Sequence, residues 1–205
     1  MVGFDLDMTL ADTRRGIAAV YDALAAETGV FIDSALICTR LGPPLDIELA
    51  NWYSAEHVPT MVRRFRELYP EIAIPVTKPM AGAAEAVHAV REQGGRTMVV
   101  TAKNQRDAER TVRFLGLPVT VVVGALWAAG KAAALTEHGA AVYVGDHTGD
   151  VDAARAAGAV SVGVASGPYD VAALRAYGAD FVLPDLLAFP GWLGSRPDRR
   201  GAGHK

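Results

Sequence analysis

Two carboxylates stand two residues apart near the start of the chain, directly after a short apolar run. Asp5 and Asp7 follow Val2-Gly3-Phe4 and are followed in turn by Thr9. Residues two apart on a strand face the same way, and where a parallel strand ends and the chain turns, both acids can flank one pocket. Like charges in one pocket repel strongly unless a cation or a shared proton relieves them. The pair therefore indicates a magnesium site with a carboxylate nucleophile.

Three later segments also place polar side chains at or after the ends of apolar runs. They are Thr101 after Val99-Val100, Lys131 after the run 119–123, and Asp146 with Asp150 after Val144. An isolated Asp-x-Asp is more often a turn or a helix N-cap, because aspartate is common in both. The order of the four segments and their placement at strand ends favour one shared functional site instead.

In this order the segments resemble the four motifs of the haloacid dehalogenase superfamily, in particular its phosphoglycolate-phosphatase-like branch with a helical cap. The resemblance extends from residue 2 to about residue 192. It implies that Asp5 is the nucleophile that becomes an aspartyl-phosphate. It also implies that Asp7 protonates the leaving oxygen and then activates water.

The same resemblance implies how the phosphoryl group is held. Thr101, together with the backbone N–H of Ala102, would bind the phosphoryl oxygens. Lys131 would neutralise both the phosphoryl charge and Asp5. Phosphoryl transfer needs such residues because its charge is spread over the equatorial oxygens, so that catalysis is mostly positioning and cationic stabilisation.

A magnesium site follows from the resemblance as well. The ligands would be the carboxylates of Asp5 and Asp146 and the main-chain carbonyl of Asp7. Asp150 would order metal-bound water or Lys131. This set suits Mg²⁺, which takes oxygen ligands in octahedral geometry and keeps several waters.

One arginine stands where the caps of this branch approach the catalytic residues. Arg40 lies beside Leu41-Gly42-Pro43-Pro44, so it is a candidate for gripping an anionic group of the substrate, with a solvated arginine as the alternative. Four other basic residues rank behind it for this role, namely Arg14, Arg15, Lys78 and Lys103.

The composition fits a soluble globular enzyme of 205 residues, with 51% hydrophobic residues, 21% charged residues and a net charge of −3. This length allows one sizeable core, or a core plus a small second domain. The near-neutral charge gives no reason to expect nucleic-acid or membrane binding, and no apolar run approaches the ~20 residues that span a bilayer. Cys38 is the only cysteine and no leader precedes Asp5, so we expect a cytoplasmic protein. Its oligomeric state leaves no signal in the sequence.

Short apolar runs alternate with helical patterns over most of the chain. The expected strands are residues 2–4, 96–100, 119–123, 141–144, 161–165 and 181–183, and the expected helices are residues 81–93, 105–115, 131–138, 151–157 and 171–177. This alternation predicts an α/β fold with a doubly wound parallel sheet. Ligands bind beyond the carboxyl ends of the strands in such a sheet, which is where Asp5, Thr101 and Asp146 fall.

Residues 13–78 break the alternation with helical patterns over residues 14–28, about 45–52 and 55–69. Inserted between the first and second strands, they predict an α-helical cap, which in the resembled branch excludes water and selects the leaving group. A helical subdomain without lid motion is the alternative.

The remaining residues divide between a core and a tail. The catalytic core would comprise residues 1–12 and 79–192, joined to the cap by linkers near residues 11–13 and 75–79. Residues 193–205 carry no apolar periodicity, so we expect a disordered tail there.

Three residues depart from the pattern of the family. Met8 stands where glycine is usual, and a positive φ there would strain the backbone by ~1 kcal/mol or more. Ala102 replaces the commoner asparagine, which leaves the phosphate contact intact because the backbone N–H makes it. Lys131 lacks the proline that often follows it.

The predicted function is magnesium-dependent hydrolysis of a small phosphorylated metabolite. A sugar-phosphate mutase shares all four motifs and differs in cap residues that hold a bisphosphate, so it stays open. A 2-haloacid dehalogenase uses the first aspartate on carbon without the second acid or the metal, and Asp7 and Asp146 argue against it. A noncatalytic phosphate-binding module or a receiver domain would not need Asp7 as an acid, and receivers lack the helical insertion.

Overall fold

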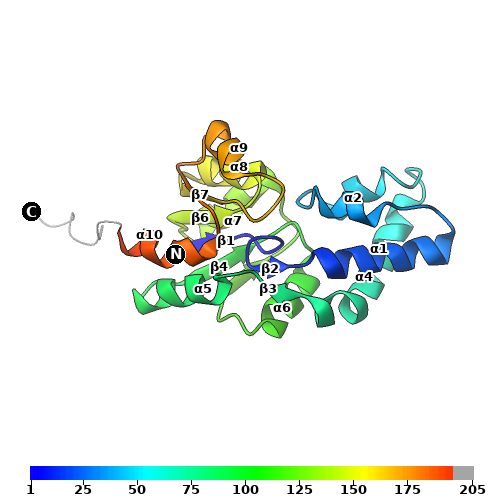
Figure 1. Ribbon diagram of the computed structural model, residues 1–205, viewed down its shortest axis with the longest axis horizontal. Helices are drawn as coiled ribbons and strands as arrows, with labels where there is room; N and C mark the ends of the chain where they lie inside the picture. The colour runs from blue at the N-terminus through cyan, green and yellow to red at the C-terminus, as the bar shows by residue number, and fades with distance from the viewer. Residues whose placement is uncertain (196–205) are drawn as a thin grey trace, which may run out of the picture.

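Six parallel strands form a sheet in the order β5-β4-β1-β6-β7-β8 in the computed structural model, which describes residues 1–195 (Figure 1). The strands are β1 (Val2–Phe4), β4 (Thr97–Val100), β5 (Val121–Val123), β6 (Val142–Gly145), β7 (Val160–Val164) and β8 (Phe181–Leu183). Strand order runs outward from β1 in both directions, which is the topology of a doubly wound sheet. The predicted fold class is confirmed.

The central strand β1 lies between β4 and β6 in close register. Phe4 of β1 pairs with Val99 of β4 and with Val144 of β6. Because the three strands run in the same direction, the residues that follow them emerge at one edge of the sheet. Those residues are Asp5, Thr101 and Asp146.

Helices cover both faces of the sheet. They are α5 (Ala83–Glu92), α6 (Gln105–Phe114), α7 (Ala132–Glu137), α8 (Thr148–Ala157), α9 (Val171–Tyr177) and α10 (Phe189–Gly194), with short 3₁₀ turns η2 (Ala128–Lys131) and η3 (Leu186–Ala188). Alternate strand residues point to opposite faces. Val99 accordingly joins the buried cluster that includes residues of α5, α6 and α10, whereas Met98 and Val100 join the cluster with α7 and α8.

Four helices between β1 and α5 pack around a hydrophobic cluster of their own, away from the sheet (Figure 1). They are α1 (Arg14–Thr28), α2 (Ser34–Cys38), α3 (Leu45–Leu49) and α4 (Val58–Ile72), followed by the 3₁₀ turn η1 (Ile74–Val76). The cluster includes Tyr21 of α1 and Phe65 of α4, whose ring centroids lie 4.9 Å apart. We call these helices and their connections the cap.

The two segments that join the cap to the sheet lie side by side. β2 (Ala11–Asp12) and β3 (Lys78–Pro79) form an antiparallel pair, with Ala11 opposite Pro79 and Asp12 opposite Lys78. The sequence predicts linkers in both places but carries no sign of their pairing. The cap is therefore attached through a two-stranded ribbon.

The cap helices differ from the sequence expectation in their bounds. α4 begins at Val58 rather than 55, because Pro59 in the first turn suits a helix start, and it continues through Pro70 to Ile72 rather than ending at 69. Proline removes only one helical donor, and the next turn still closes, since the Ala73 N–H donates to the Tyr69 carbonyl at 2.8 Å. α3 ends at Leu49, and the five-residue α2 has no counterpart among the predicted helices.

The core also extends further than predicted at its carboxyl end. α10 covers residues 193–194 of the expected tail because its Phe189 is buried against Phe4 of β1, with ring centroids 5.4 Å apart. Residues 196–205 of that predicted tail lie outside the described residues. Within residues 1–195, each helix is too short or too polar to cross a membrane.

Candidate active site

Three carboxylates meet at the carboxyl edge of the sheet. Asp5 follows β1, Asp146 follows β6, and Asp150 lies in the first turn of α8. One oxygen from each lies within 4.8 Å of the others, and all three side chains are buried. The structure thus brings together the three residues whose carboxylates were predicted to serve the metal.

The electrostatics of this cluster call for a cation. Burial, with repulsion from Asp150 and Asp7, raises the pKa of Asp5 to about 7 despite the attraction of Lys131. Burial and the Asp5 and Asp150 charges likewise raise the pKa of Asp146 well above its usual range. Oδ1 of Asp5 is buried, and the Lys131 ammonium lies 3.0 Å from it. Oxygen ligands in this arrangement fit a hard divalent cation such as Mg²⁺.

Lys131 supplies a fixed positive charge beside the cluster. Its Nζ lies 3.0 Å from Oδ1 of Asp5 and 2.7 Å from Oδ1 of Asp150, and it donates to the Tyr143 hydroxyl at 3.0 Å. Burial works to lower the pKa of Lys131, but the Asp150 and Asp5 carboxylates outweigh it and hold the pKa above its ordinary value. The side chain is therefore a buried ammonium that faces Asp5, although no proline follows it.

Asp150 has both carboxylate oxygens engaged. Oδ1 accepts from Lys131, and Oδ2 accepts from the backbone N–H of His147 at 3.1 Å, closing a capping box at the start of α8. Of the two roles predicted for Asp150, the ordering of Lys131 is the one with a direct contact.

Asp7 lies apart from the carboxylate cluster. Its Oδ1 accepts a 2.7 Å hydrogen bond from the Thr13 hydroxyl and lies 3.1 Å from Nζ of Lys103. Asp7 and Asp5 both line one cavity. The carboxylate of Asp7 therefore faces the cavity, as an acid–base residue requires.

Thr101 and Ala102 form part of the same cavity wall. The Thr101 N–H donates to the Val123 carbonyl at 3.0 Å, and its hydroxyl oxygen accepts from the N–H of Lys103 at 3.3 Å. These bonds hold the loop after β4 against β5. The threonine side chain is buried, so its position next to the carboxylates is fixed.

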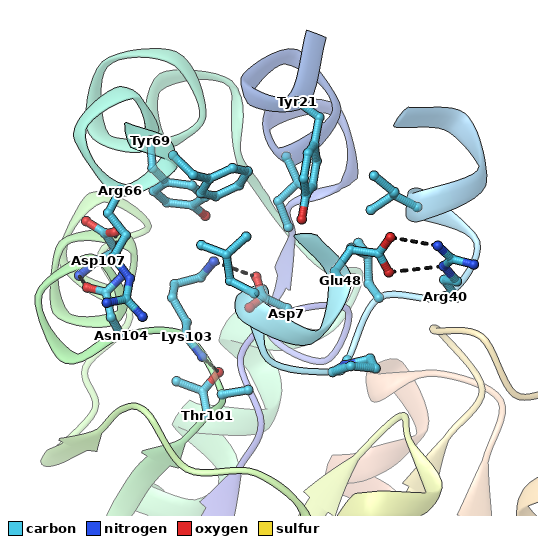
Figure 2. A pocket seen from close by; sticks show the side chains of 18 of the residues that line it. Asp7, Tyr21, Arg40, Glu48, Arg66, Tyr69, Thr101, Lys103, Asn104 and Asp107 are labelled. Atoms are coloured by element: carbon cyan, nitrogen blue, oxygen red, sulfur yellow. Dashed lines mark hydrogen bonds and ion pairs between the residues drawn. The ribbon is translucent and has the colours of Figure 1, made fainter. Parts of the chain in front are cut away.

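The cavity lies between the cap and the edge of the sheet (Figure 2) and has a volume of about 100 Å³. The residues that the sheet side contributes include Asp5, Asp7, Thr101, Ala102 and Lys103. The cap contributes Tyr21, Arg40, Glu48, Phe65, Arg66 and Tyr69. A space of this size suits a small ligand.

Arg40 lines this cavity but is already paired. Its guanidinium donates two hydrogen bonds to Glu48, at 2.7 and 3.1 Å (Figure 2). Trp52 donates to the same carboxylate at 3.0 Å. The arginine predicted to grip the substrate is thus held by a bidentate ion pair. Arg66, from α4, reaches the cavity with no ion pair among the described residues.

Where the cap meets the sheet edge, a loop of the cap rests on an aromatic cluster. The His147 ring lies 4.9 Å from the rings of both Trp127 and Tyr169. Gly42 of the cap sits so close that a Cβ there would come within 2.8 Å of His147 and 3.2 Å of Trp127. This glycine allows the contact between the two parts.

The sequence analysis missed or undervalued several residues that shape the site: Thr9, Thr13, Glu48, Tyr69, Lys103 and Tyr143. Lys103 carried a signal, because it follows Thr101 by two residues in the same loop. Tyr69 carried none, since its approach to the site depends on how α4 packs.

Met8 has φ of 61°, the left-handed conformation expected if methionine replaced a glycine here.

Buried carboxylates beside a lysine, at the carboxyl edge of a parallel α/β sheet, are an arrangement that can support phosphoryl transfer. Residues 2–164 match the family of haloacid dehalogenase-like hydrolases, and the chain belongs to that family.

Individual relatives match most of the length of this chain. A phosphoglycolate phosphatase from Caulobacter vibrioides is 29% identical over 218 residues, spanning 92% of this chain and 88% of the relative. The tyrosine-protein kinase PtkA of Mycobacterium tuberculosis is 28% identical over 181 residues, spanning 82% of this chain and 62% of the relative. The solved structure of a haloacid dehalogenase-like family hydrolase from Streptococcus pneumoniae superposes with a TM-score of 0.82 at 22% identity, over 94% of this chain and 97% of that one.

Proposed function

We propose that this protein is a magnesium-dependent phosphatase that hydrolyses a small phosphorylated metabolite through an aspartyl-phosphate on Asp5. The observation that carries the proposal is that the two acids, Asp5 and Asp7, have different surroundings. Asp5 lies within the buried cluster beside Lys131, whereas Asp7 faces the same cavity but is bound by different partners. One carboxylate is thereby placed for attack and another for proton transfer.

The first half-reaction transfers the phosphoryl group to the protein. A carboxylate oxygen of Asp5 attacks phosphorus, and the bond from phosphorus to the leaving oxygen breaks. Asp7 donates its proton to that oxygen, so a neutral alcohol leaves. Thr101, the Ala102 N–H and Lys131 hold the phosphoryl oxygens during transfer.

The second half-reaction restores the protein. Asp7, now a carboxylate, takes a proton from a water molecule whose oxygen attacks phosphorus. The bond between phosphorus and Asp5 breaks, which releases inorganic phosphate and the free carboxylate. Splitting the hydrolysis into two displacements replaces one difficult step by two easier ones.

The residues that would hold Mg²⁺ are the carboxylates of Asp5 and Asp146 and the main-chain carbonyl of Asp7. Asp150 would order its surroundings through Lys131. The ion would neutralise charge on the transferred group. The raised pKa values of Asp5 and Asp146 support this assignment, because a bound cation would remove the repulsion behind them.

A small substrate is supported by the cavity and by the relative from Caulobacter. About 100 Å³ lies between the acids and the cap, and that relative is a phosphoglycolate phosphatase. The leaving group would face Arg40, Arg66 and Tyr69 of the cap. We propose a phosphoglycolate-like metabolite as the substrate, with the cytoplasm as its place of action.

A screen of phosphorylated metabolites, with Mg²⁺ and with EDTA, tests the proposal by measuring phosphate release. Release that needs Mg²⁺ and that is absent from the Asp5→Asn variant supports it. Conversion of a sugar phosphate to its isomer without phosphate release would identify the mutase alternative instead. Halide release from a 2-haloacid in EDTA would identify a dehalogenase.

A further inference from the structure

Lys103 is a buried cation at the active site to which the four family motifs give no role. Its side chain is 8% exposed, and its Nζ lies 3.1 Å from Oδ1 of Asp7 and 4.2 Å from the centre of the Tyr69 ring. We propose that Lys103 is a positioning residue for Asp7, and that Tyr69 makes this positioning depend on the cap. The inference rests on the proposed function.

Two donors converge on a single oxygen of Asp7. The Thr13 hydroxyl and the Lys103 ammonium both contact Oδ1, whereas Oδ2 accepts no hydrogen bond from residues 1–195. A carboxylate held by one oxygen has its other oxygen in a defined direction. Oδ2 is therefore the atom that carries the proton to the leaving group and later accepts one from water.

Tyr69 shields the ion pair from water on the cap side. The tyrosine is 2% exposed, and its ring covers the Lys103 ammonium (Figure 2). A cation over an aromatic face is attracted by the ring, and the attraction is stronger when both groups are desolvated. The same shielding strengthens the attraction between Lys103 and Asp7, because water no longer screens it.

The contacts that hold Asp7 come from two parts of the chain. Lys103 belongs to the loop after β4, whereas Tyr69 belongs to α4 and Thr13 directly precedes α1. Displacement of the cap would uncover Lys103 and let water reach the pair. Asp7 is thus held in its catalytic orientation only while the cap covers the site.

A role in binding the substrate would use Lys103 differently. As a substrate ligand, Lys103 would have to contact an anionic group on the leaving alcohol. In the structure its ammonium is already committed to Asp7 and Tyr69. The two roles predict different dependence on the leaving group, which makes them separable by kinetics.

The test is the variant Lys103→Met on two substrates whose alcohols carry no additional anionic group, propyl phosphate and p-nitrophenyl phosphate. The ratio kcat/KM covers all steps up to departure of the leaving group, so it isolates the role of Asp7 as an acid. p-Nitrophenolate needs little protonation, whereas propoxide needs it fully. We expect kcat/KM for propyl phosphate to fall ~10-fold or more beyond the loss on p-nitrophenyl phosphate, within the ~100- to 10,000-fold range of general acid catalysis.

Arg91→Met is the matched control, because Arg91 is an exposed cation in the last turn of α5, outside the cavity. This control should leave the ratio of the kcat/KM values for the two substrates unchanged. An equal loss on both substrates in Lys103→Met would overturn the proposal. A loss confined to substrates whose alcohol carries an additional anionic group would also overturn it, because Lys103 would then be a substrate ligand.

Two variants of Tyr69 test the link to the cap. Tyr69→Phe retains a ring over the ammonium, whereas Tyr69→Leu does not. We expect the ratio of the kcat/KM values for the two substrates to shift several-fold further in Tyr69→Leu than in Tyr69→Phe. Equal ratios in the two variants would refute the coupling between Tyr69 and Asp7. These variants also provide the measurement if Lys103→Met melts before the assay temperature. Phosphate release by the unaltered protein, and its loss in Asp5→Asn, tests the proposed function separately.

Discussion

The hydroxyl of Thr9 donates a 2.6 Å hydrogen bond to Oδ1 of Asp146, between two buried side chains 137 positions apart in the chain. On the other side, Gly167 approaches so closely that a Cβ there would overlap Oδ2 of Asp146. The carboxylate predicted to bind the metal is thus oriented from two directions. Such partners of a metal ligand commonly tune its affinity for the metal.

Asp146→Ala should weaken Mg²⁺ binding severely, because a carboxylate ligand is lost. Thr9→Val keeps the ligand but frees its orientation, and we expect about a tenfold loss of affinity. Isothermal titration with MgCl₂ measures both, with Thr120→Val, an exposed threonine, as the control. An unchanged titration of Asp146→Ala would show that the metal lies elsewhere.

Asp5→Asn should abolish turnover while the chain stays folded, because an amide cannot form the acyl-phosphate. The substitution removes one buried negative charge from beside Lys131, which leaves Asp150 as the partner of the ammonium. Phosphate release measures the loss of turnover, and a circular dichroism spectrum checks that the chain is still folded. Residual activity within about tenfold of the unaltered protein would contradict the nucleophile assignment.

Asp7→Asn should separate the two half-reactions. With p-nitrophenyl phosphate little protonation of the leaving group is needed, so the phosphoenzyme still forms, but attack of water then lacks its base. Rapid quench should show a burst of nitrophenol followed by slow turnover, with phosphate trapped on Asp5. An alkyl phosphate should show no burst. Equal losses on the two substrates without trapped phosphoenzyme would leave Asp7 as a metal-positioning residue only.

The metal-free protein should lose stability as the pH rises from about 4 to 7. Burial raises the pKa of Asp5 from 3.8 to about 7 in the folded chain, so the folded state binds this proton more tightly than the unfolded state. Stability is then fully present below the unfolded value and is lost as the pH passes the folded one. Asp146 acts in the same direction.

Thermal melts in EDTA at pH 5 and pH 8 measure this effect. We expect the lower Tm at pH 8, and a larger gain from added Mg²⁺ at pH 8 than at pH 5, since the ion stabilises the ionised carboxylates. The control is Asp5→Asn, whose melting temperature should depend less on pH. A melting temperature in EDTA that is the same at pH 5 and pH 8 would show that charge repulsion in the carboxylate cluster does not destabilise the folded protein.

Gly42→Ala should impair docking of the cap. Gly42 has φ of 145°, where a side chain costs about 1–3 kcal/mol, and its Cβ would press on His147 and Trp127. We expect kcat/KM to fall about tenfold, with most of the change in KM. Gly191→Ala, in open space on α10, is the control. Kinetics equal to those of the control would mean that this contact does not hold the cap.

The parts of the site that lie at strand ends could be predicted from the sequence. Asp5, Thr101 and Asp146 each follow an apolar run, and the parallel topology alone brings such ends together. Lys131 was harder, because it lies at the end of a 3₁₀ turn rather than a strand. Its position nevertheless agrees with the prediction.

The contacts across the cap could not be predicted in this way. Tyr69 reaches Lys103 only because α4 packs against α1 with Phe65 and Tyr21 between them, which depends on side-chain packing rather than on periodicity. The pairing of Arg40 with Glu48 likewise joins α3 to the segment after α2, a helix of five residues with little periodic signal. Pro70 misled the prediction of α4, because the helix tolerates the loss of one donor.

The ribbon of β2 and β3 makes the cap an exchangeable module. Since Asp12 lies opposite Lys78, a two-residue turn between them would close the ribbon as a hairpin and leave β1, β4 and β6 untouched. The hydrophobic cluster of the cap also shares no residue with the two clusters of the sheet. A different cap could therefore be inserted at the same two residues, which would change the surroundings of the cavity and of Asp7 while Asp5, Lys131, Asp146 and Asp150 keep their contacts with one another.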